Sequence, residues 1–129
     1  MQGFLYLILV IVGFFVVMQL YIRISSVMKK GKIVDGVNGK IGKDIKAGKR
    51  ILVYFYSNSC AACKPMTPII DKLKKEFESI HTVNLAKDME TARAFGVMGT
   101  PATVLVENKK IMSFNLGAKS EVFLRKLLN

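Results

Sequence analysis

The hydrophobic and polar positions of this chain divide it into two unlike regions. Residues 4–22 are apolar except for Gly13 and Gln19, and no charged side chain occurs among the first 22 residues. A run of this length predicts a helix that spans a bilayer. Beyond residue 22 the apolar positions are interleaved with lysine, glycine and acidic residues. We therefore expect a transmembrane anchor over residues 1–24 and a small water-exposed domain after it.

A cleaved secretory signal is the alternative interpretation of the N-terminal run. Such signals carry a basic residue before a shorter apolar core and a small-residue cleavage pattern after it. Here no lysine or arginine precedes the run, and Ser25 and Ser26 offer only a weak cleavage pattern. Length and flanks favour a retained, single-pass anchor that contacts the membrane through residues 4–22.

Residues 25–49 are predicted to form a linker and lead-in. Glycine recurs five times in this segment among scattered lysines, which interrupts any long helix. A short edge strand is expected within residues 34–41. The remainder is expected to be mobile and solvated.

Residues 50–129 carry the pattern of a folded domain. Residues 51–56 are uniformly apolar, as expected of a central strand buried on both faces. Apolar residues then recur at helical spacing over residues 66–77, and residues 82–85 predict the next strand. Asp88 is expected to cap a short helix that ends at Gly96.

The last part of the chain predicts a hairpin and a helix. Residues 102–106 and 111–116 are expected to pair as antiparallel strands around Asn108-Lys109, and Ser120 is expected to cap the final helix. Strands and helices that alternate before a hairpin predict an α/β fold with a mixed central sheet and helices on both faces.

The charge balance changes the picture at the membrane. The chain carries 20 Lys and Arg against 9 Asp and Glu, a net charge of +11. Lysine outnumbers arginine without any arginine–aromatic pattern, so nucleic-acid binding is not expected. A basic domain beside a bilayer can contact anionic headgroups, and a solvated lysine-rich surface is the simpler alternative.

Cations after the apolar run also predict its orientation. Arg23, Lys29, Lys30 and Lys32 follow the run closely, and only the α-amino group precedes it. The positive-inside rule then places the domain in the cytoplasm. A domain on the periplasmic or outer side is the alternative.

The two cysteines of the chain carry its clearest chemistry. They stand in Cys60-Ala61-Ala62-Cys63, between a predicted strand and a predicted helix. A helix N-terminus favours a thiolate on the first sulfur, and the thiolate is the form that attacks disulfides. This order of strand, cysteine pair and helix indicates a redox dithiol.

Two other interpretations of the cysteine pair are weaker. A zinc site needs about four ligands, and the chain offers no further cysteine and one histidine, His81. A purely structural disulfide that closes so short a loop adds little stability. We therefore expect no metal and no cofactor beyond the Cys60–Cys63 disulfide. His81 is expected at the surface, where a strand begins, without a catalytic role.

With these residues in place, the chain resembles the thioredoxin superfamily over residues 50–129. The matching features are the strand that leads to the cysteine pair, Lys64 directly after it, Pro68, and the segment 95–103 that contains Thr100-Pro101. The resemblance implies a thioredoxin-like fold, a cis Pro101 beside the cysteines, and a Thr100 backbone that pairs with an extended substrate.

Departures from the family pattern bear on redox tuning. Ser59 stands where thioredoxins usually have Trp, and Ala61-Ala62 stands in place of Gly-Pro. Tyr54 occupies the position of a buried Asp that manages protons for the second cysteine, and Thr82 lies near the position of a Lys that partners that Asp. Ala61, Ala62, Tyr54 and Lys64 are therefore the residues expected to tune the redox chemistry.

These features together predict a membrane-anchored thiol–disulfide oxidoreductase that reduces protein disulfides. Cys60 is expected to attack the substrate and Cys63 to resolve the mixed disulfide. The expected partners are protein disulfides and an upstream thiol electron donor. A disulfide-forming oxidant, an extracytoplasmic thiol reductase for protein maturation and a redox-inactive binding module remain as alternatives, although the presence of both cysteines disfavours the last.

Overall fold

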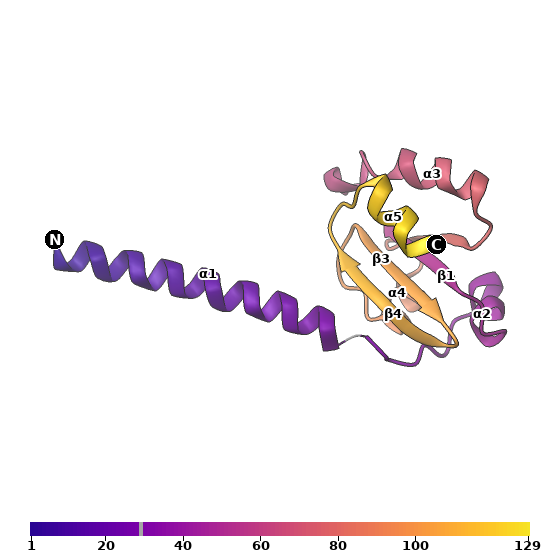
Figure 1. Cartoon of the computed structure of the whole chain (residues 1–129), viewed down its shortest axis with the longest axis horizontal. Helices are drawn as coiled ribbons and strands as arrows, with labels where there is room; N and C mark the ends of the chain where they lie inside the picture. Colours follow the sequence, from indigo (N-terminus) through magenta and orange to yellow (C-terminus); the bar gives the residue numbers. More distant parts are fainter. Residues whose placement is uncertain (29) are drawn as a thin grey trace.

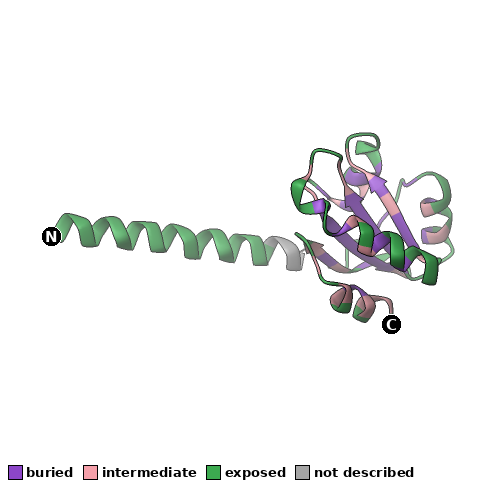
Figure 2. Cartoon of the chain, turned by 90° about the horizontal axis from the view of Figure 1, so that it is seen from above, coloured by how far each residue is buried: buried purple, intermediate pink, exposed green. Residues whose placement is uncertain are grey.

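The chain forms one long N-terminal helix followed by an α/β domain (Figure 1). The computed structural model describes residues 1–28 and 30–129, without the side chains of residues 25–28. Lys29, one of the four cations that predict the orientation, lies outside the described residues. Helix α1 (Gln2–Met28) exposes its described side chains along its whole length (Figure 2). Its segment Gln2–Ile24 is long and apolar enough to cross a membrane, a property that N-terminal signal sequences share.

A four-stranded mixed sheet lies at the centre of the domain, as predicted. Its strands are β1 (Ile51–Tyr56), β2 (Ile80–Asn84), β3 (Ala102–Glu107) and β4 (Lys110–Leu116), in the spatial order β2-β1-β3-β4. Strand β1 pairs parallel with β2 and antiparallel with β3, and β3 pairs antiparallel with β4. The β3–β4 turn falls on Asn108 and Lys109, whose φ angles are 52° and 67°. These positive angles match the twist of a two-residue hairpin.

Helices cover both faces of the sheet because side chains alternate along each strand. On one face, Val53 and Phe55 pack in a core with residues of α2 (Gly39–Lys46) and α4 (Met89–Phe95). On the other, Leu52 and Tyr54 pack with residues of α3 (Thr67–Glu76) and α5 (Glu121–Leu128). The strands are accordingly the most buried part of the molecule (Figure 2).

Local signals fix the helix ends where the sequence predicted them. The Asp88 side chain accepts a hydrogen bond from the Thr91 N–H at 3.1 Å, and α4 ends at Gly96, whose φ is 72°. The Ser120 hydroxyl accepts from the Phe123 N–H at 3.3 Å at the start of α5. These contacts satisfy backbone groups that a helix end leaves without partners.

The segment before β1 differs from the expected solvated linker. Val34, Val37 and Ile45 are buried in the core on the α2 face. Instead of an edge strand within residues 34–41, the structure has one isolated bridge, between Ile33 and Lys110, and α2 begins at Gly39. Apolar side chains spaced three to eight residues apart supply this packing, although lysine and glycine dominate the composition between them.

Backbone hydrogen bonds attach this segment to β4. The Gly31 N–H donates to the Ile111 carbonyl at 2.7 Å, the Ile111 N–H donates to the Lys32 carbonyl at 2.9 Å, and the Val34 N–H donates to the Lys109 carbonyl at 2.9 Å. We call residues 31–34 the strap. Only residues 25–30 separate the apolar segment of α1 from it.

Candidate redox site

The cysteine pair follows the carboxyl end of the central strand β1. After Tyr56 the chain turns, with the Cys60 N–H bonded to the Ser57 carbonyl at 3.2 Å, and enters a short 3-10 helix, η1 (Ala61–Cys63). Cys60 and Cys63 form a disulfide whose Cα atoms are 5.3 Å apart. Cys63 is buried, whereas Cys60 is partly exposed. Cys60 is therefore the more accessible of the two cysteines.

The backbone around the pair favours negative charge on Cys60. The Cys63 N–H donates a hydrogen bond to the Cys60 Sγ at 3.2 Å, and the same contact would stabilise a Cys60 thiolate after reduction. The α-helix itself begins only at Thr67, later than predicted, with Pro68 in its first turn. Proline fits there because N–H groups in the first turn of a helix make no hydrogen bond within the helix, so proline, which lacks an N–H, loses none.

A pair of hydroxyls lies beneath Cys63. Tyr54 is fully buried, and its hydroxyl lies 3.0 Å from the Thr67 Oγ1 and 3.5 Å from the Cys63 carbonyl. The Thr67 hydroxyl donates to that carbonyl at 2.9 Å, so it accepts from Tyr54. Burial raises the pKa of Tyr54, against the smaller lowering effect of the Thr67 bond. Tyr54 therefore stays a neutral hydrogen-bonding group beneath Cys63.

The sheet register brings Thr100 and Pro101 to the end of the sheet where β1 finishes. The peptide between them is cis, as the resemblance implied. The next residue, Ala102, pairs with Phe55 of β1 on one side and with Leu116 of β4 on the other. The Pro101 carbonyl accepts from the Gly117 N–H at 2.8 Å. Pro101 is buried and Thr100 is partly exposed, opposite the end of β1 from which the cysteine loop departs.

The remaining predicted residues lie on the outer surface of the site. Ala61, Ala62 and Lys64 are exposed. A shallow groove of about 300 Å³ runs beside the disulfide, and its lining includes Tyr56, Asn58, Cys60, Cys63, Lys64 and Pro68. This groove is large enough to take part of an extended chain next to Cys60.

Two residues near the site were not singled out from the sequence. Thr67 was overlooked because a threonine at a helix start carries no chemical signature until the helix packs on β1. Met98 is 92% exposed in the loop that leads to Pro101. Its position between Gly96 and Gly99, outside any apolar period, was a signal that it is not a core residue.

The expectation for His81 was wrong in its placement. His81 is 8% exposed, near the start of the edge strand β2 and opposite Val53, and its Nε2 lies 2.9 Å from the Asp44 Oδ2 of α2. An apolar strand partner and an acidic residue on the covering helix bury it.

Comparisons with known proteins agree with this arrangement. Residues 33–129 match the family model named Thioredoxin. A thioredoxin of Buchnera aphidicola subsp. Baizongia pistaciae is 32% identical over 88 residues, covering 66% of this chain and 81% of the relative. A thioredoxin of Haemophilus influenzae is 29% identical over 82 residues, covering 61% and 77%. A mutant thioredoxin from Halobacterium salinarum superposes with a TM-score of 0.60 at 23% identity, covering 70% of this chain and 83% of that one.

Proposed function

The chain belongs to the thioredoxin family, and we propose on that premise that it is a membrane-anchored thiol–disulfide oxidoreductase that reduces protein disulfides. The observation that carries the proposal is the unequal exposure of the two sulfurs. Cys60 is partly exposed and accepts a backbone N–H, whereas Cys63 is buried behind it. This is the arrangement that an attacking and a resolving thiol require.

The proposed reaction begins from the reduced dithiol. The Cys60 thiolate attacks one sulfur of a substrate disulfide, and the other substrate sulfur leaves as a thiolate that takes up a proton. The Cys63 thiol then loses its proton and attacks the Cys60 sulfur, which releases the second substrate thiol. Two electrons have passed to the substrate, and Cys60 and Cys63 are left as a disulfide. An upstream thiol donor reverses this by the same exchange, so the disulfide is the only redox group proposed.

Residues around the cysteines are proposed to hold the substrate and tune the sulfurs. The Thr100 backbone lies at the sheet edge and is proposed to pair with an extended substrate, with the cis Pro101 holding that loop. Ala61, Ala62 and Lys64 flank the sulfurs on the outside, and the Tyr54 hydroxyl lies beneath them. We propose that these four residues set the reduction potential.

Helix α1 is proposed to anchor the enzyme in a membrane. Its apolar segment Gln2–Ile24 supports this by length and composition. Cations follow the segment and none precedes it, which favours a domain in the cytoplasm. Thiols are kept reduced there, so the pair would act as a reductant.

The proposal is tested with the full chain in detergent micelles, supplied with dithiothreitol and insulin as the model disulfide. We expect rapid insulin reduction, loss of that activity in Cys60→Ser, and a trapped mixed disulfide in Cys63→Ser. Lys126→Met serves as the control, because it alters an exposed residue of α5 outside the groove and removes no sulfur. Mixed disulfides trapped by Cys60→Ser instead would reverse the two roles, and an unreactive wild-type chain would refute the activity.

A further inference from the structure

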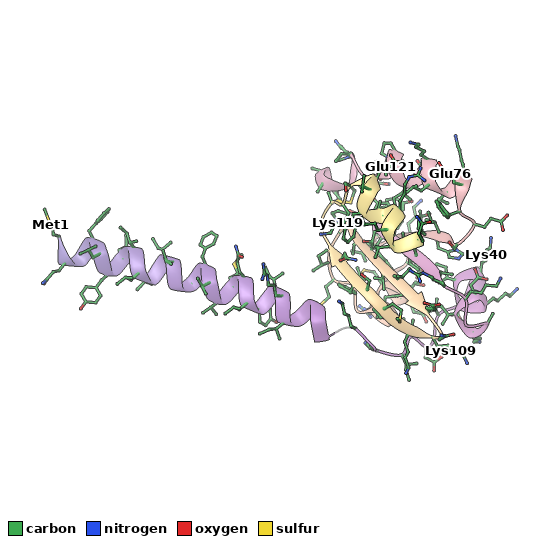
Figure 3. The ribbon with its side chains drawn as sticks, in the orientation of Figure 1. Met1, Lys40, Glu76, Lys109, Lys119 and Glu121 are labelled. Carbon is green, nitrogen blue, oxygen red and sulfur yellow. A yellow bond between two sulfur atoms is a disulfide. The ribbon has the colours of Figure 1, made fainter. Side chains whose placement is uncertain are left out.

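A hollow of about 360 Å³ lies between the end of α1 and the final residues of β4. Three cations contribute to its lining, Arg23, Lys30 and Lys119, and none of the described residues that line it is acidic. Figure 3 shows Lys119 on the side of the domain nearest α1. Ile22, Phe114 and Leu116 add apolar side chains to the lining, and Asn115 adds a polar one. A concave surface with cations and apolar groups together suits a ligand that has both characters.

The hollow stands at the level where a bilayer would end. The apolar segment of α1 ends at Ile24, so Arg23 lies in its last turn and would reach the headgroup layer. Lys30 directly precedes Gly31, whose N–H is bonded to Ile111 of β4. The strap thus keeps the β4 side of the domain beside the end of the apolar segment.

We propose that this hollow binds the phosphate headgroup of an anionic phospholipid. The inference rests on the proposed insertion of α1 into a membrane, and it is independent of the redox chemistry. Guanidinium and ammonium groups donate charge-assisted hydrogen bonds to phosphate oxygens. The exposed Leu116 and Ile22 side chains are placed to contact the glycerol and upper acyl carbons of the same lipid.

One contact holds a cation of this hollow in place. The Lys119 Nζ lies 5.3 Å from the centre of the Phe123 ring. A cation over an aromatic face loses rotational freedom before any ligand arrives, so less entropy is lost when a phosphate binds.

Occupation of the hollow would also orient the redox site. Ala102 pairs with Leu116 beside the hollow and with Phe55 at the end of β1 that leads to Cys60. The hollow and the cysteine pair therefore lie at the same end of the sheet, where β1 and β4 finish and β3 begins. A bound headgroup would hold this end of the sheet near the bilayer. The accessible substrates would then be disulfides close to the membrane surface.

The experiment is a titration of the isotope-labelled full chain in neutral maltoside micelles, followed through its backbone amide resonances. Dihexanoyl phosphatidylglycerol is the anionic lipid, dihexanoyl phosphatidylcholine is the zwitterionic lipid, and inorganic phosphate is the free anion. We expect saturable shifts at residues 23, 30 and 115–119 with the anionic lipid, and much weaker binding of the other two. Each basic residue near an anionic lipid surface contributes about fivefold in affinity, so Arg23→Gln and Lys119→Gln should each weaken binding about fivefold.

Lys87→Gln is the matched control, because Lys87 is exposed just after β2, the outer strand farthest from β4. Its affinity should equal that of the wild type. If the zwitterionic lipid bound equally well, the contact would be apolar only. If inorganic phosphate bound equally well, the hollow would be a site for free anions. Either result, or the absence of shifts, overturns the proposal. Insulin reduction measured on the same samples reports separately on the proposed function.

Discussion

Thr67 connects the two elements that form the redox site. Its hydroxyl donates to the carbonyl of Cys63 and accepts from Tyr54 on β1. The same contact joins the start of α3 to the central strand. The Thr67 hydroxyl therefore helps to hold both Cys63 in position and α3 against β1.

Replacing Thr67 with valine keeps the shape of the side chain and removes its hydroxyl. The buried Tyr54 hydroxyl would then lose its close partner, whereas the Cys63 carbonyl keeps the hydrogen bond from the Met66 N–H at 3.1 Å. An unsatisfied buried polar group costs about 1–3 kcal/mol, so Thr67→Val should lower the free energy of unfolding by about that amount in urea denaturation. Thr82→Val, at a half-buried position of β2, is the control and should change it by less than about 0.5 kcal/mol. Equal effects of the two changes would contradict this role.

The cysteine pair was predicted from its spacing, which carries the chemistry, and Pro101 was predicted through the family resemblance. The Tyr54 hydroxyl was placed beneath the pair only through the family resemblance. The partner of that hydroxyl could not be predicted, because the contact between Tyr54 and Thr67 joins residues 13 positions apart and depends on how α3 packs.

At the scale of elements, α2 is joined to the sheet through Asp44 and His81. The main effect on His81 is burial, which lowers its pKa, while the bond to Asp44 opposes this. For Asp44, burial raises the pKa, but the hydrogen bonds and charges of His81 and Lys49 together lower it. Both groups therefore bind protons less readily in the folded chain than in the unfolded chain.

The sign of the pH dependence follows from these shifts. Because the folded pKa of His81 is depressed, its contribution to stability is present above the unfolded value of about 6.5 and is lost as the pH falls below it. We expect the free energy of unfolding to decrease between about pH 7.5 and about pH 5.5. His81→Gln should reduce that decrease, since His81 is the sole histidine of the chain. Urea titrations at the two pH values measure it, and an unchanged pH dependence in the variant would count against the argument.

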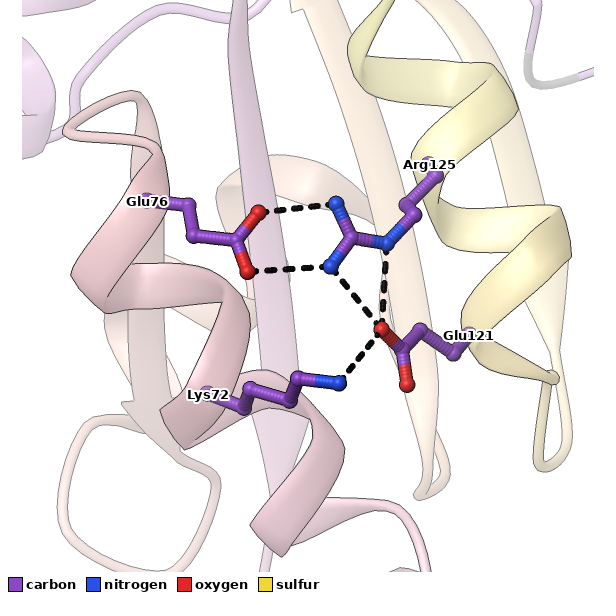
Figure 4. Close-up of polar contacts among 4 residues, drawn as sticks. All are labelled: Lys72, Glu76, Glu121 and Arg125. Atoms are coloured by element: carbon purple, nitrogen blue, oxygen red, sulfur yellow. Dashed lines mark hydrogen bonds and ion pairs between the residues drawn. The ribbon is translucent and has the colours of Figure 1, made fainter.

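Helices α3 and α5 are joined by four charged side chains (Figure 4). Arg125 donates two hydrogen bonds to Glu76, at 2.8 and 3.0 Å, and two more to Glu121, at 2.9 and 3.0 Å. Lys72 donates to Glu121 at 3.0 Å. Paired donors of this kind fix geometry more firmly than a single exposed ion pair.

Arg125→Met keeps the aliphatic stem and removes these bonds. We expect faster amide hydrogen exchange in α5, because the helix is less firmly held on α3. The difference from the wild type should shrink at high salt, which screens exposed charges. Lys126→Met, an exposed neighbour on the same helix, is the control and should leave exchange in α5 close to the wild-type rate. A difference that persists at high salt would indicate lost packing rather than lost charge.

Elements with strong local signals were predicted well, and the strap was not. Capping residues and a hairpin turn act within a few residues of the chain, so α4, α5 and the β3–β4 hairpin followed from the sequence. The strap is held by hydrogen bonds to β4, about eighty residues later. Its own glycines and lysines resemble solvated chain, and only tertiary packing shows otherwise.

At the scale of the whole molecule, the unequal charge on the two ends of α1 predicts which side of the membrane the domain occupies. Arg23 lies in the last turn of the apolar segment and Lys30 follows it, whereas residues 1–22 carry no cationic side chain. We expect the domain to stay in the cytoplasm. After mild reduction, a membrane-impermeant thiol reagent should label Cys60 only in permeabilised cells. The Cys60→Ser chain provides the background, and labelling of Cys60 in intact cells would place the domain on the outer side.

The strap also sets how such an enzyme would meet its substrates. Six residues separate the apolar segment from the first strap hydrogen bond, and six residues span at most about 20 Å even when fully extended. The cysteines would be confined to a thin layer beside the bilayer. Proteins embedded in the same membrane would reach them by lateral diffusion in two dimensions, at a high effective concentration. Soluble proteins would have to arrive from the bulk solution. The short connection between the membrane span and the domain would therefore by itself favour membrane-bound partners.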